Sequence, residues 1–230
     1  MKVLIIIPAY NEEGNIERVV KNLIDNYPQF DYVVVNDGSH DRTAEICYQN
    51  NFNLLDQPQN LGLAGAFQTG MKYALAKGYD AAIQYDGDGQ HRPEFISAMA
   101  DEIAKGADIV IGSRFVTEKK PSTLRMTGSN ILQGLIKLTT GRTVHDPTSG
   151  MRMYSKNIIR ILAENINMGP EPDTLAYFIR CGAKVAETQV KMDERISGES
   201  YLNLSRSVSY MLTMSVSILL VGCFRKKIEL

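Results

Sequence analysis

Two carboxylates one residue apart, Asp86 and Asp88, directly follow an apolar run over residues 80–85. Carboxylates this close repel each other, and a cation between them relieves the repulsion. Their hard oxygen atoms favour Mg²⁺ or Mn²⁺, either of which also binds phosphate oxygens of a substrate. Gln90 offers a neutral third oxygen. The Asp-Gly-Asp-Gly segment is also good turn chemistry, so the pattern alone leaves a metal site and a simple turn open.

Polar segments follow two earlier apolar runs in the same manner. Residues 10–12 (Tyr-Asn-Glu) come after the run 2–7, and residues 37–39 (Asp-Gly-Ser) come after the run 32–35. Each segment precedes an expected helix, so its side chains can act as helix caps, with Ser39 or Asp41 capping the second helix. The alternative is contact with a ligand, in which these side chains hydrogen-bond a ribose or a base.

Strands and helices are expected to alternate through the first half of the chain. Strands are predicted over 2–7, 32–35, 53–55, 80–85 and 108–112, and helices begin near 16, 41, 63 and 93. This alternation predicts a mainly parallel sheet with helices on both faces. Ligands of such sheets bind beyond the carboxyl ends of the strands. The three polar segments are therefore expected to line one crevice.

The second half of the chain is less regular. A helix is expected over 122–140, a strand over 151–154, a loop at 169–173 that opens a helix, a strand over 184–192, and an apolar helical tail over 203–224. No repeat or low-complexity linker divides the chain. The sequence predicts one α/β catalytic domain over residues 1–202 and a C-terminal helix with a basic tail over 203–230.

Several motifs in one order resemble the family 2 glycosyltransferases, which have the GT-A (Rossmann-like) fold. They are Pro-Ala-Tyr-Asn-Glu at 8–12, Asp-Gly-Ser at 37–39 and Asp-Gly-Asp-Gly-Gln-His at 86–91. Three further segments restrict the resemblance to one branch of this family. They are Gly-Ser-Arg at 112–114, Asp-Pro-Thr-Ser-Gly at 146–150 and Arg-x-x-Gly-x-Ser at 195–200. The narrower branch contains the dolichol-phosphate mannose synthases and the bacterial polyprenyl-phosphate glycosyltransferases.

The resemblance implies a role for each matching position. The nucleotide would be held by Pro8, Ala9, Tyr10, Glu12, Asp37, Gly65, Asp86 and Gly87. The metal, Mg²⁺ or Mn²⁺, would be bound by Asp86, Asp88 and Gln90. Arg114 and Arg195 would neutralise phosphate charge. A cation and guanidinium groups in place beforehand stabilise the charge that develops on a leaving nucleoside diphosphate.

The acceptor of the sugar stays open at this point. An inverting transfer to a saccharide hydroxyl needs a carboxylate base, for which Asp146, Glu171 and Asp173 are candidates, although each also suits a turn or a helix cap. A polyprenyl phosphate is largely ionised near neutral pH and needs no base. Relatives with lipid phosphate acceptors often have Lys then Tyr after Gly-x-Ser, whereas here Tyr201 follows Ser200 directly. The chain has no Trp, so the Gln-x-x-Arg-Trp motif of processive synthases is absent and transfer of a single sugar is expected.

The composition of the chain limits which partners it binds and in which cellular compartment it is expected. Lys plus Arg (25) nearly equals Asp plus Glu (26), which argues against a nucleic-acid binder. Three cysteines without a CxxC pair are typical of a reducing cytosol. The first apolar run is too short for a signal peptide. We expect a cytoplasmic protein.

The C-terminal tail predicts contact with a membrane or with a partner subunit. Residues 208–224 are mostly apolar, followed by Arg225, Lys226 and Lys227, and are shorter than the roughly 20 residues that cross a bilayer. Ser205, Ser209, Thr213 and Ser217 form one small polar stripe. This pattern predicts an amphipathic helix on the inner face of the cell membrane or against another subunit in a homo-oligomer. The alternative is a helix that closes the domain's own core.

Two other functions compete with sugar transfer from a UDP-, GDP- or dTDP-sugar. A catalytically silent nucleotide-sugar-binding assembly partner would bind nucleotide without turnover. A sugar-1-phosphate nucleotidyltransferase also uses a parallel sheet and paired carboxylates. Such enzymes usually carry a glycine-rich segment with Arg and Lys near the N-terminus, where this chain has residues 8–12 instead.

Overall fold

A computed structural model describes residues 1–166, 168–193 and 204–230. Its strands are β1 (Val3–Ala9), β2 (Asp31–Asn36), β3 (Leu54–Asp56), β4 (Ala81–Gln84), β5 (Ile109–Ser113), β6 (Arg152–Ser155) and β7 (Val185–Gln189). Its helices are α1 (Ile16–Asn26), α2 (Thr43–Gln49), α3 (Gly62–Ala76), η1 (Pro93–Phe95), α4 (Ile96–Ala104), α5 (Leu124–Thr140), α6 (Lys156–Glu164), α7 (Pro172–Arg180) and α8 (Leu204–Phe224).

The strands form one mixed sheet in the order β3-β2-β1-β4-β6-β5-β7. Every neighbouring pair is parallel except those made by β6, which runs antiparallel to both β4 and β5. Ala9 lies opposite Asn36, and Ile6 lies opposite Gln84, so β1, β2 and β4 end at the same edge. The predicted α/β fold with a mainly parallel sheet is confirmed.

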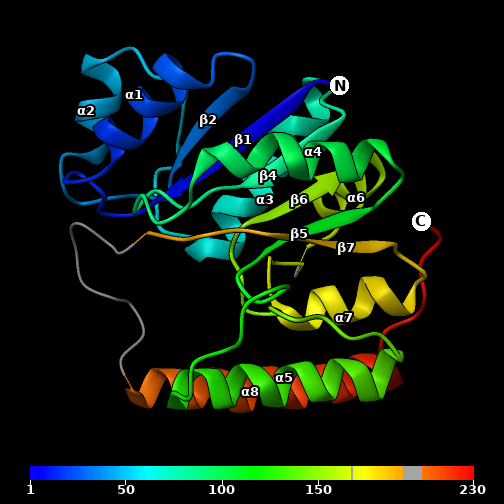
Figure 1. Cartoon of the computed structure of the whole chain (residues 1–230). Helices are drawn as coiled ribbons and strands as arrows, with labels where there is room; N and C mark the ends of the chain where they lie inside the picture. The colour runs from blue at the N-terminus through cyan, green and yellow to red at the C-terminus, as the bar shows by residue number, and fades with distance from the viewer. Residues whose placement is uncertain (167, 194–203) are drawn as a thin grey trace.

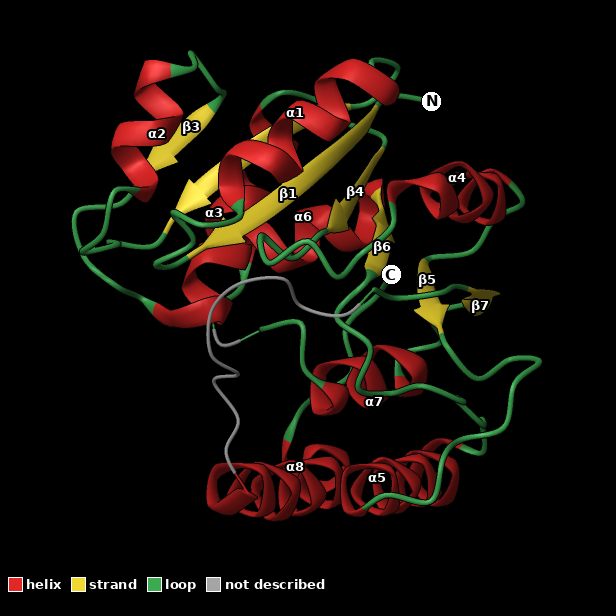
Figure 2. Cartoon of the chain, turned by 60° about the vertical axis from the view of Figure 1, so that its left-hand side comes forward, coloured by secondary structure: helices red, strands yellow, loops and turns green. Residues whose placement is uncertain are grey.

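Alternating side chains of β1 enter two different cores. Leu4 and Ile6 face one core, which also holds buried side chains of α3, α5, α6, α7 and α8. Ile5 and Ile7 face the other core, which holds those of α1, α2 and α4. Because both faces of the strand are covered, its run of branched residues is apolar throughout. Figures 1 and 2 show the helices on both sides of the sheet.

Helix α6 was missing from the predicted elements. It begins directly after β6, with no intervening loop to mark its start. Its Ile158, Ile159 and Leu162 are buried. These residues have the spacing of an amphipathic helix. The signal was present, but a nine-residue helix that follows a short strand is easily taken for part of a loop.

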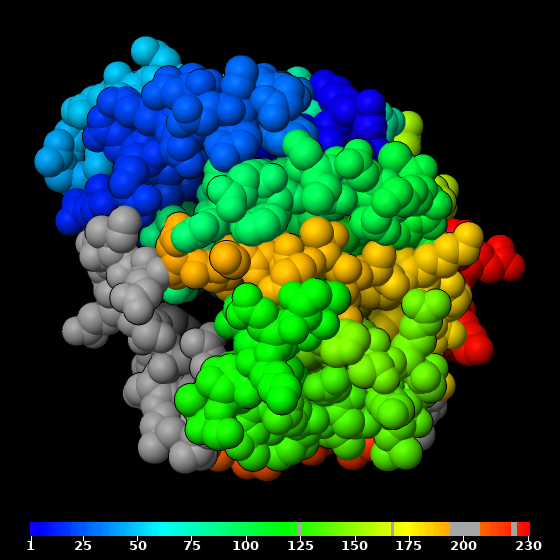
Figure 3. Space-filling view, in the orientation of Figure 1, coloured from blue at the N-terminus to red at the C-terminus, as the bar shows by residue number. Residues whose placement is uncertain are grey.

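Helices α5 and α8 are far apart in the sequence and lie side by side at one end of the molecule (Figures 1 and 2). Their contact is close, since a Cβ atom on Gly128 would lie 3.0 Å from Cγ of Met211. Figure 3 shows α5 and the N-terminal half of the chain on opposite sides of β7. Within the described residues, no helix has the length and apolar character needed to span a bilayer.

The orientation of α8 differs from the simple amphipathic helix that was predicted. Ile218 is fully buried, but Leu212 and Leu219 of the same apolar run are exposed. Ser217, from the predicted polar stripe, instead donates a hydrogen bond to the Asp173 carboxylate at 2.5 Å. One side of α8 therefore completes the domain core, and a second apolar side remains on the surface.

Candidate active site

The polar segments after β1 and β2 are joined by hydrogen bonds that backbone N–H groups donate. The N–H of Asp37 donates to the carbonyl of Ala9 at 2.8 Å, and the N–H of Asn11 donates to Oγ of Ser39 at 3.0 Å. Asp41 accepts a hydrogen bond from the N–H of Thr43, the first residue of α2, at 2.9 Å. Asp41 precedes Arg42, which is the N-cap residue of α2, and Ser39 links the two loops, so neither Ser39 nor Asp41 is the cap that was expected.

Asp37 is buried and held in place by the segment that precedes α3. Its Oδ1 accepts a hydrogen bond from the N–H of Leu61 at 2.8 Å. Gly38 beside it has φ +63°, and a Cβ there would lie 2.5 Å from the backbone carbon of Gln59. The glycine of this motif is therefore required by backbone conformation and by close approach.

The segment after β4 lies against the segment after β1. A Cβ on Gly87 would lie 3.2 Å from the carbonyl oxygen of Pro8 and 3.6 Å from Cγ of Glu12. Together with the bond between Asp37 and Ala9, this contact brings all three polar segments to one place. Tyr10 is exposed beside them, with its ring 6.4 Å from that of His40.

Two neighbouring side chains, His91 and Gln84, orient Asp86, and the sequence had predicted a role in the site for neither. Nδ1 of buried His91 accepts a hydrogen bond from the N–H of Asp86 at 3.0 Å, which leaves the proton of the neutral ring on Nε2. That nitrogen lies 3.5 Å from Oδ2 of Asp86. Nε2 of Gln84 donates to Oδ1 at 3.2 Å. The Asp86 side chain is still 37% exposed, so it can bind a ligand.

Asp88 and Gln90 have different surroundings. Asp88 is buried, and its Oδ1 accepts a hydrogen bond from the N–H of Gln90 at 3.0 Å. The Gln90 amide donates to the carbonyl of Asp193 at 3.3 Å. In the part of the chain that the structure describes, no group of three or more His, Cys, Asp or Glu side chains is placed to hold a metal. Two carboxylates and an amide oxygen nevertheless fit a hard divalent ion whose other ligands come from water and phosphate.

Arg114 and Asp146 form a bidentate ion pair. Nε of Arg114 lies 2.7 Å from Oδ2 of Asp146, and Nη2 donates to Oδ1 at 2.9 Å. Asp146 is completely buried, whereas the Arg114 side chain is partly exposed. Among the contacts of the described residues, the pair uses two of the five N–H donors of the Arg114 guanidinium.

Glu171 and Asp173, the other two candidate bases, both contact α8. The hydroxyl of Tyr210 donates a short hydrogen bond to Oε2 of Glu171. Burial raises the pKa of Tyr210, and the nearby Glu171 raises it further, so this hydroxyl stays protonated. Asp173 accepts from Ser217 and, at the start of α7, from the N–H of Thr174 at 2.8 Å. Asp173 is nevertheless not the cap of α7, because the N-cap residue is Glu171 and Asp173 lies in the first turn of the helix.

The buried Arg152 was missed by the sequence analysis. Its guanidinium donates to the carbonyl oxygens of Pro147 at 2.6 Å, Ser149 at 3.0 Å and Glu171 at 3.2 Å. It therefore joins the 146–150 segment to the loop that carries Glu171. The only signal for it was a basic residue at the start of an otherwise apolar strand.

The candidate residues are linked by a closed series of contacts. A Cβ on Gly150 would lie 3.0 Å from Oδ2 of Asp86, which joins the 146–150 segment to the 86–88 segment. A Cβ on Gly169 would lie 3.1 Å from Cβ of Ala64, which joins the Glu171 loop to the first turn of α3. Gly65 is in that turn, packed against Leu61. Arg195, with the rest of the predicted 195–200 motif, lies outside the described residues.

A mainly parallel α/β sheet with paired carboxylates beyond β4 and buried Asp37 beyond β2 agrees with a glycosyltransferase of the GT-A fold. The sequence model of the family described as Glycosyl transferase family 2 matches residues 4–162. The chain belongs to this family.

Individual relatives agree with that assignment. The undecaprenyl-phosphate mannosyltransferase of Micrococcus luteus is 31% identical over 217 residues, with 88% of each chain covered. The polyprenol monophosphomannose synthase of Mycolicibacterium smegmatis is 28% identical over 219 residues, covering 88% of this chain and 81% of the relative.

A solved structure shows the same fold. It is the glucosyl-3-phosphoglycerate synthase of Mycobacterium tuberculosis, in complex with Mn²⁺, UDP-glucose and phosphoglyceric acid. The TM-score is 0.69 at 15% identity, and the match covers 96% of this chain and 79% of that one.

Proposed function

We propose that this glycosyltransferase transfers a single sugar, with inversion, from a nucleotide-sugar to a polyprenyl phosphate, with Mg²⁺ or Mn²⁺ at Asp86, Asp88 and Gln90. The observation that carries the proposal is the meeting of three strand-end segments around a partly exposed carboxylate, Asp86. The names of the Micrococcus and Mycolicibacterium relatives support a lipid phosphate acceptor and a mannosyl donor.

Donor binding is assigned to the segments after β1, β2 and β4. Asp37, whose carboxylate accepts a hydrogen bond from the N–H of Leu61, would contact the base or the ribose, and Tyr10 and Glu12 of the neighbouring segment would contribute to the same site. UDP-, GDP- and dTDP-sugars all remain donors to test. The Mycobacterium tuberculosis neighbour, crystallised with Mn²⁺ and UDP-glucose, supports a nucleotide and a metal in this fold.

Charge stabilisation is the main chemical task of the proposed site. A bound divalent ion supplies a positive charge beside the diphosphate. Asp86 and Asp88 would hold it, and His91 would keep the Asp86 carboxylate in one orientation. Arg114, held by Asp146, would offer its remaining N–H donors to a phosphate without reorganisation during the reaction.

The three candidate bases favour a phosphate acceptor. Asp146 is paired with Arg114, Glu171 accepts from Tyr210, and Asp173 accepts from Ser217. Each of the three carboxylates therefore already has a partner within the protein. An ionised phosphate needs no base, so these contacts are compatible with it.

A thermal-shift panel tests the metal and nucleotide assignment. UDP, GDP and dTDP are each added with and without Mn²⁺, because a bound ligand raises Tm by mass action. We expect a Mn²⁺-dependent rise that Asp88→Ala abolishes and that Asp101→Ala, an exposed carboxylate on α4, retains. An equal Mn²⁺-dependent rise in all three proteins would refute the metal site.

Turnover assays separate the competing functions. The best nucleotide is used as its sugar conjugate, and transfer to an undecaprenyl phosphate is followed by mass spectrometry. A nucleotide shift without transfer or donor hydrolysis would identify a silent binder. Formation of a nucleotide-sugar from a nucleoside triphosphate and a sugar-1-phosphate would identify a nucleotidyltransferase.

The acceptor class is tested at Glu171 and Asp173. With a phosphate acceptor, Glu171→Gln and Asp173→Asn should keep activity within about threefold, since neither removes a proton. A general base contributes roughly 10²–10⁴-fold. A loss of that size in either variant, with unchanged Tm, would favour a saccharide hydroxyl as acceptor.

A lipid acceptor would place the reaction at a membrane surface. We propose that the enzyme is peripheral on the cytoplasmic face of the cell membrane.

A further inference from the structure

The ion pair between Arg114 and Asp146 joins two loops that are far apart in the sequence. Arg114 follows the last residue of β5, and Asp146 lies between α5 and β6. The Asp146 carboxylate also accepts a hydrogen bond from the backbone N–H of Arg114 at 3.2 Å. A guanidinium stabilises phosphate charge without reorganisation only when it is held in place beforehand. Both loops must therefore be fixed, and side chains of β7 contact each of them.

Glu187 of β7 holds the loop that carries Asp146. Its Oε1 accepts hydrogen bonds from the N–H groups of His145 at 2.9 Å and Asp146 at 3.1 Å. Its Oε2 accepts from the same N–H of His145 at 2.9 Å and lies 2.7 Å from Nδ1 of the His145 ring. The Glu187 side chain is 12% exposed, so water would be a poor substitute for the carboxylate.

Gln189, two residues later on β7, holds the loop that carries Arg114. Its Oε1 accepts a hydrogen bond from the N–H of Thr117 at 2.9 Å, and its Nε2 donates to the carbonyl of Arg114 at 2.9 Å. Side chains two residues apart on a strand lie on the same face. Glu187 and Gln189 therefore contact the two loops of the ion pair from one face of β7.

The chain after β7 reaches the proposed metal segment as well. The N–H of Asp193 donates to the carbonyl of Gln90 at 2.9 Å, and the Gln90 amide donates to the carbonyl of Asp193 at 3.3 Å. Nε of Arg92 donates to Oδ1 of Asp193 at 2.8 Å. Figure 1 shows β7 beside β5 at the edge of the sheet. This edge strand and the residues that follow it thus contact both Arg114 loops and the segment of Gln90.

We propose that Glu187 and Gln189 are positioning residues that fix the Arg114 guanidinium in one orientation toward a substrate phosphate. This inference rests on the proposed function, which gives Arg114 a phosphate to bind. It adds two residues that belong to no motif of the sequence. Glu187 acts through the loop of Asp146, since a carboxylate placed directly beside a phosphate would be repelled by it.

The orientation of Arg114 is measured without substrate by NMR. The Nε–H signal of Arg114, identified by its loss in Arg114→Gln, reports on the bond to Asp146. We expect this proton to exchange with water at least about tenfold faster in Glu187→Ala, because a bonded proton exchanges only when the bond opens. Gln189→Met should act in the same direction. An unchanged exchange rate in either variant would overturn the role given to that residue.

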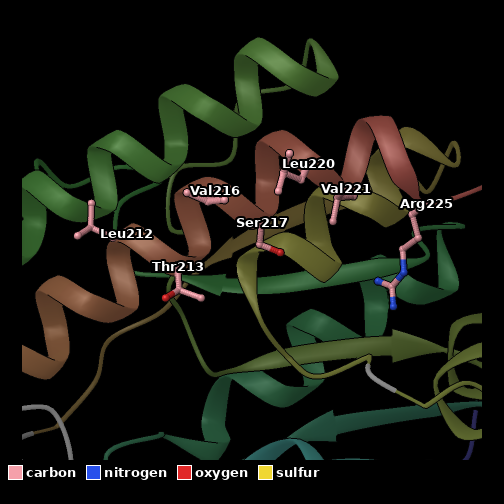
Figure 4. Close-up of a pocket in the computed structure, with 7 residues that line it drawn as sticks. All are labelled: Leu212, Thr213, Val216, Ser217, Leu220, Val221 and Arg225. Carbon is pink, nitrogen blue, oxygen red and sulfur yellow. The ribbon is translucent and has the colours of Figure 1, made fainter.

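Two controls separate this effect from a general loosening of the fold. Asp108→Ala removes a carboxylate that accepts the N–H of Lys184 at 2.8 Å, at the other end of the β5 and β7 pair. Arg225 is an internal reference: it lies 4.8 Å from the centre of the Tyr177 ring and lines a groove along α8 (Figure 4). Arg114 should exchange normally in Asp108→Ala, and Arg225 in every variant. Faster exchange of both arginines in Glu187→Ala would overturn the inference.

A double-mutant cycle tests whether Glu187 acts through Arg114. The kcat/KM for transfer to undecaprenyl phosphate is compared in the wild type, Glu187→Ala, Arg114→Gln and the double variant. We expect Glu187→Ala to lose roughly 10–100-fold, because a small displacement of a charge-stabilising group is costly. In the Arg114→Gln background the same change should cost at most about threefold. Losses that multiply would overturn the inference, since Glu187 would then act independently of Arg114.

A conservative variant keeps the test decisive if Glu187→Ala does not fold. Glu187→Gln retains the side-chain volume and one acceptor oxygen, so its exchange rate and activity should lie between those of the wild type and Glu187→Ala. Glu187→Gln and Gln189→Met then carry the same measurements, and wild-type exchange in both would overturn the inference. Faster Arg114 exchange in a protein that transfers no sugar would refute the proposed function and leave the positioning of Arg114 intact.

Discussion

At the scale of single residues, the two carboxylates of the 86–88 segment are not equivalent. Asp86 is partly exposed and is contacted by His91 and Gln84, whereas Asp88 is buried and bonded to the backbone of Gln90. A carboxylate that is exposed and oriented by its neighbours is suited to bind an ion. His91 is best explained as a positioning residue, because its ring contacts Asp86 on two sides.

Changing His91 should weaken metal binding without touching either carboxylate. His91→Phe removes the acceptor for the N–H of Asp86, and we expect Mn²⁺ affinity to fall by roughly 10–100-fold. His91→Asn retains an acceptor oxygen and should lose less. Mn²⁺ titration in the presence of the preferred nucleoside diphosphate measures both. Equal affinities in the Phe variant and the wild type would argue against the positioning role.

Arg152 should matter for the acceptor loops more than for the donor. Arg152→Met leaves three carbonyl oxygens without their donor, at a cost of about 1–3 kcal/mol for each buried group. We expect a lower Tm and a larger rise in KM for the acceptor than for the donor. Arg160→Met, at an exposed position of α6, is the control. A uniform fall in activity with both KM values unchanged would contradict this role.

At the scale of elements, glycines determine how closely neighbouring elements pack. Gly70 lets α3 lie against β1, since a Cβ there would be 2.3 Å from Cγ2 of Ile6. Gly134 of α5 has no neighbour within 4 Å of its would-be Cβ. Both are helix-interior glycines, so intrinsic helix propensity favours Ala at both positions.

The same substitution should therefore have opposite effects at these two positions. Gly134→Ala should raise the free energy of unfolding by roughly 0.5–1 kcal/mol, because it lowers backbone entropy in the unfolded chain. Gly70→Ala should lower it, since overpacking costs about 1–3 kcal/mol and outweighs the propensity gain. Urea unfolding of both variants measures the two changes. Stabilisation by Gly70→Ala would show that β1 and α3 can separate slightly at no cost.

At the scale of the whole molecule, Cys47 reports on the integrity of the second core. It is fully buried beside the β1 and β2 side chains of that core. Burial raises the pKa of its thiol to about 11, with a smaller contribution from the charge of Asp56. The thiolate, which is the reactive form, is therefore scarce in the folded protein at any physiological pH.

Alkylation should distinguish Cys47 from a thiol near the surface. At pH 8 a pKa of about 11 leaves roughly one thiol in a thousand ionised, so native Cys47 should resist iodoacetamide. Cys181, which is only partly buried, should react sooner. Raising the pH toward 11 should increase the reactivity of Cys47, and urea should remove the protection. Peptide mass spectrometry measures both sites, and equal native rates at pH 8 would contradict the buried, neutral thiol.

Local patterns were enough to predict most elements and the family. The apolar run at 2–7 encodes a strand by itself, and the polar residues that follow β1, β2 and β4 must meet because parallel neighbours end at one edge. The predicted 37–39 and 86–88 segments consequently came together. The roles assigned to them in nucleotide and metal binding remain predictions.

Other features depend on contacts that no local pattern specifies. Four such features involve segments that only packing brings together. They are the reversed direction of β6, the carbonyl partners of Arg152, the pairing of Arg114 with Asp146 and the use of both sides of α8. Glu171 illustrates the difference, since its position between two prolines is visible in the sequence, but its bond to Tyr210, 39 residues away, is not. The sequence alone determined which chemical groups stand at the strand ends, because periodicity is a short-range property. Only the tertiary structure decided which of those groups are engaged and which surface stays apolar, because burial and hydrogen bonding depend on distant neighbours.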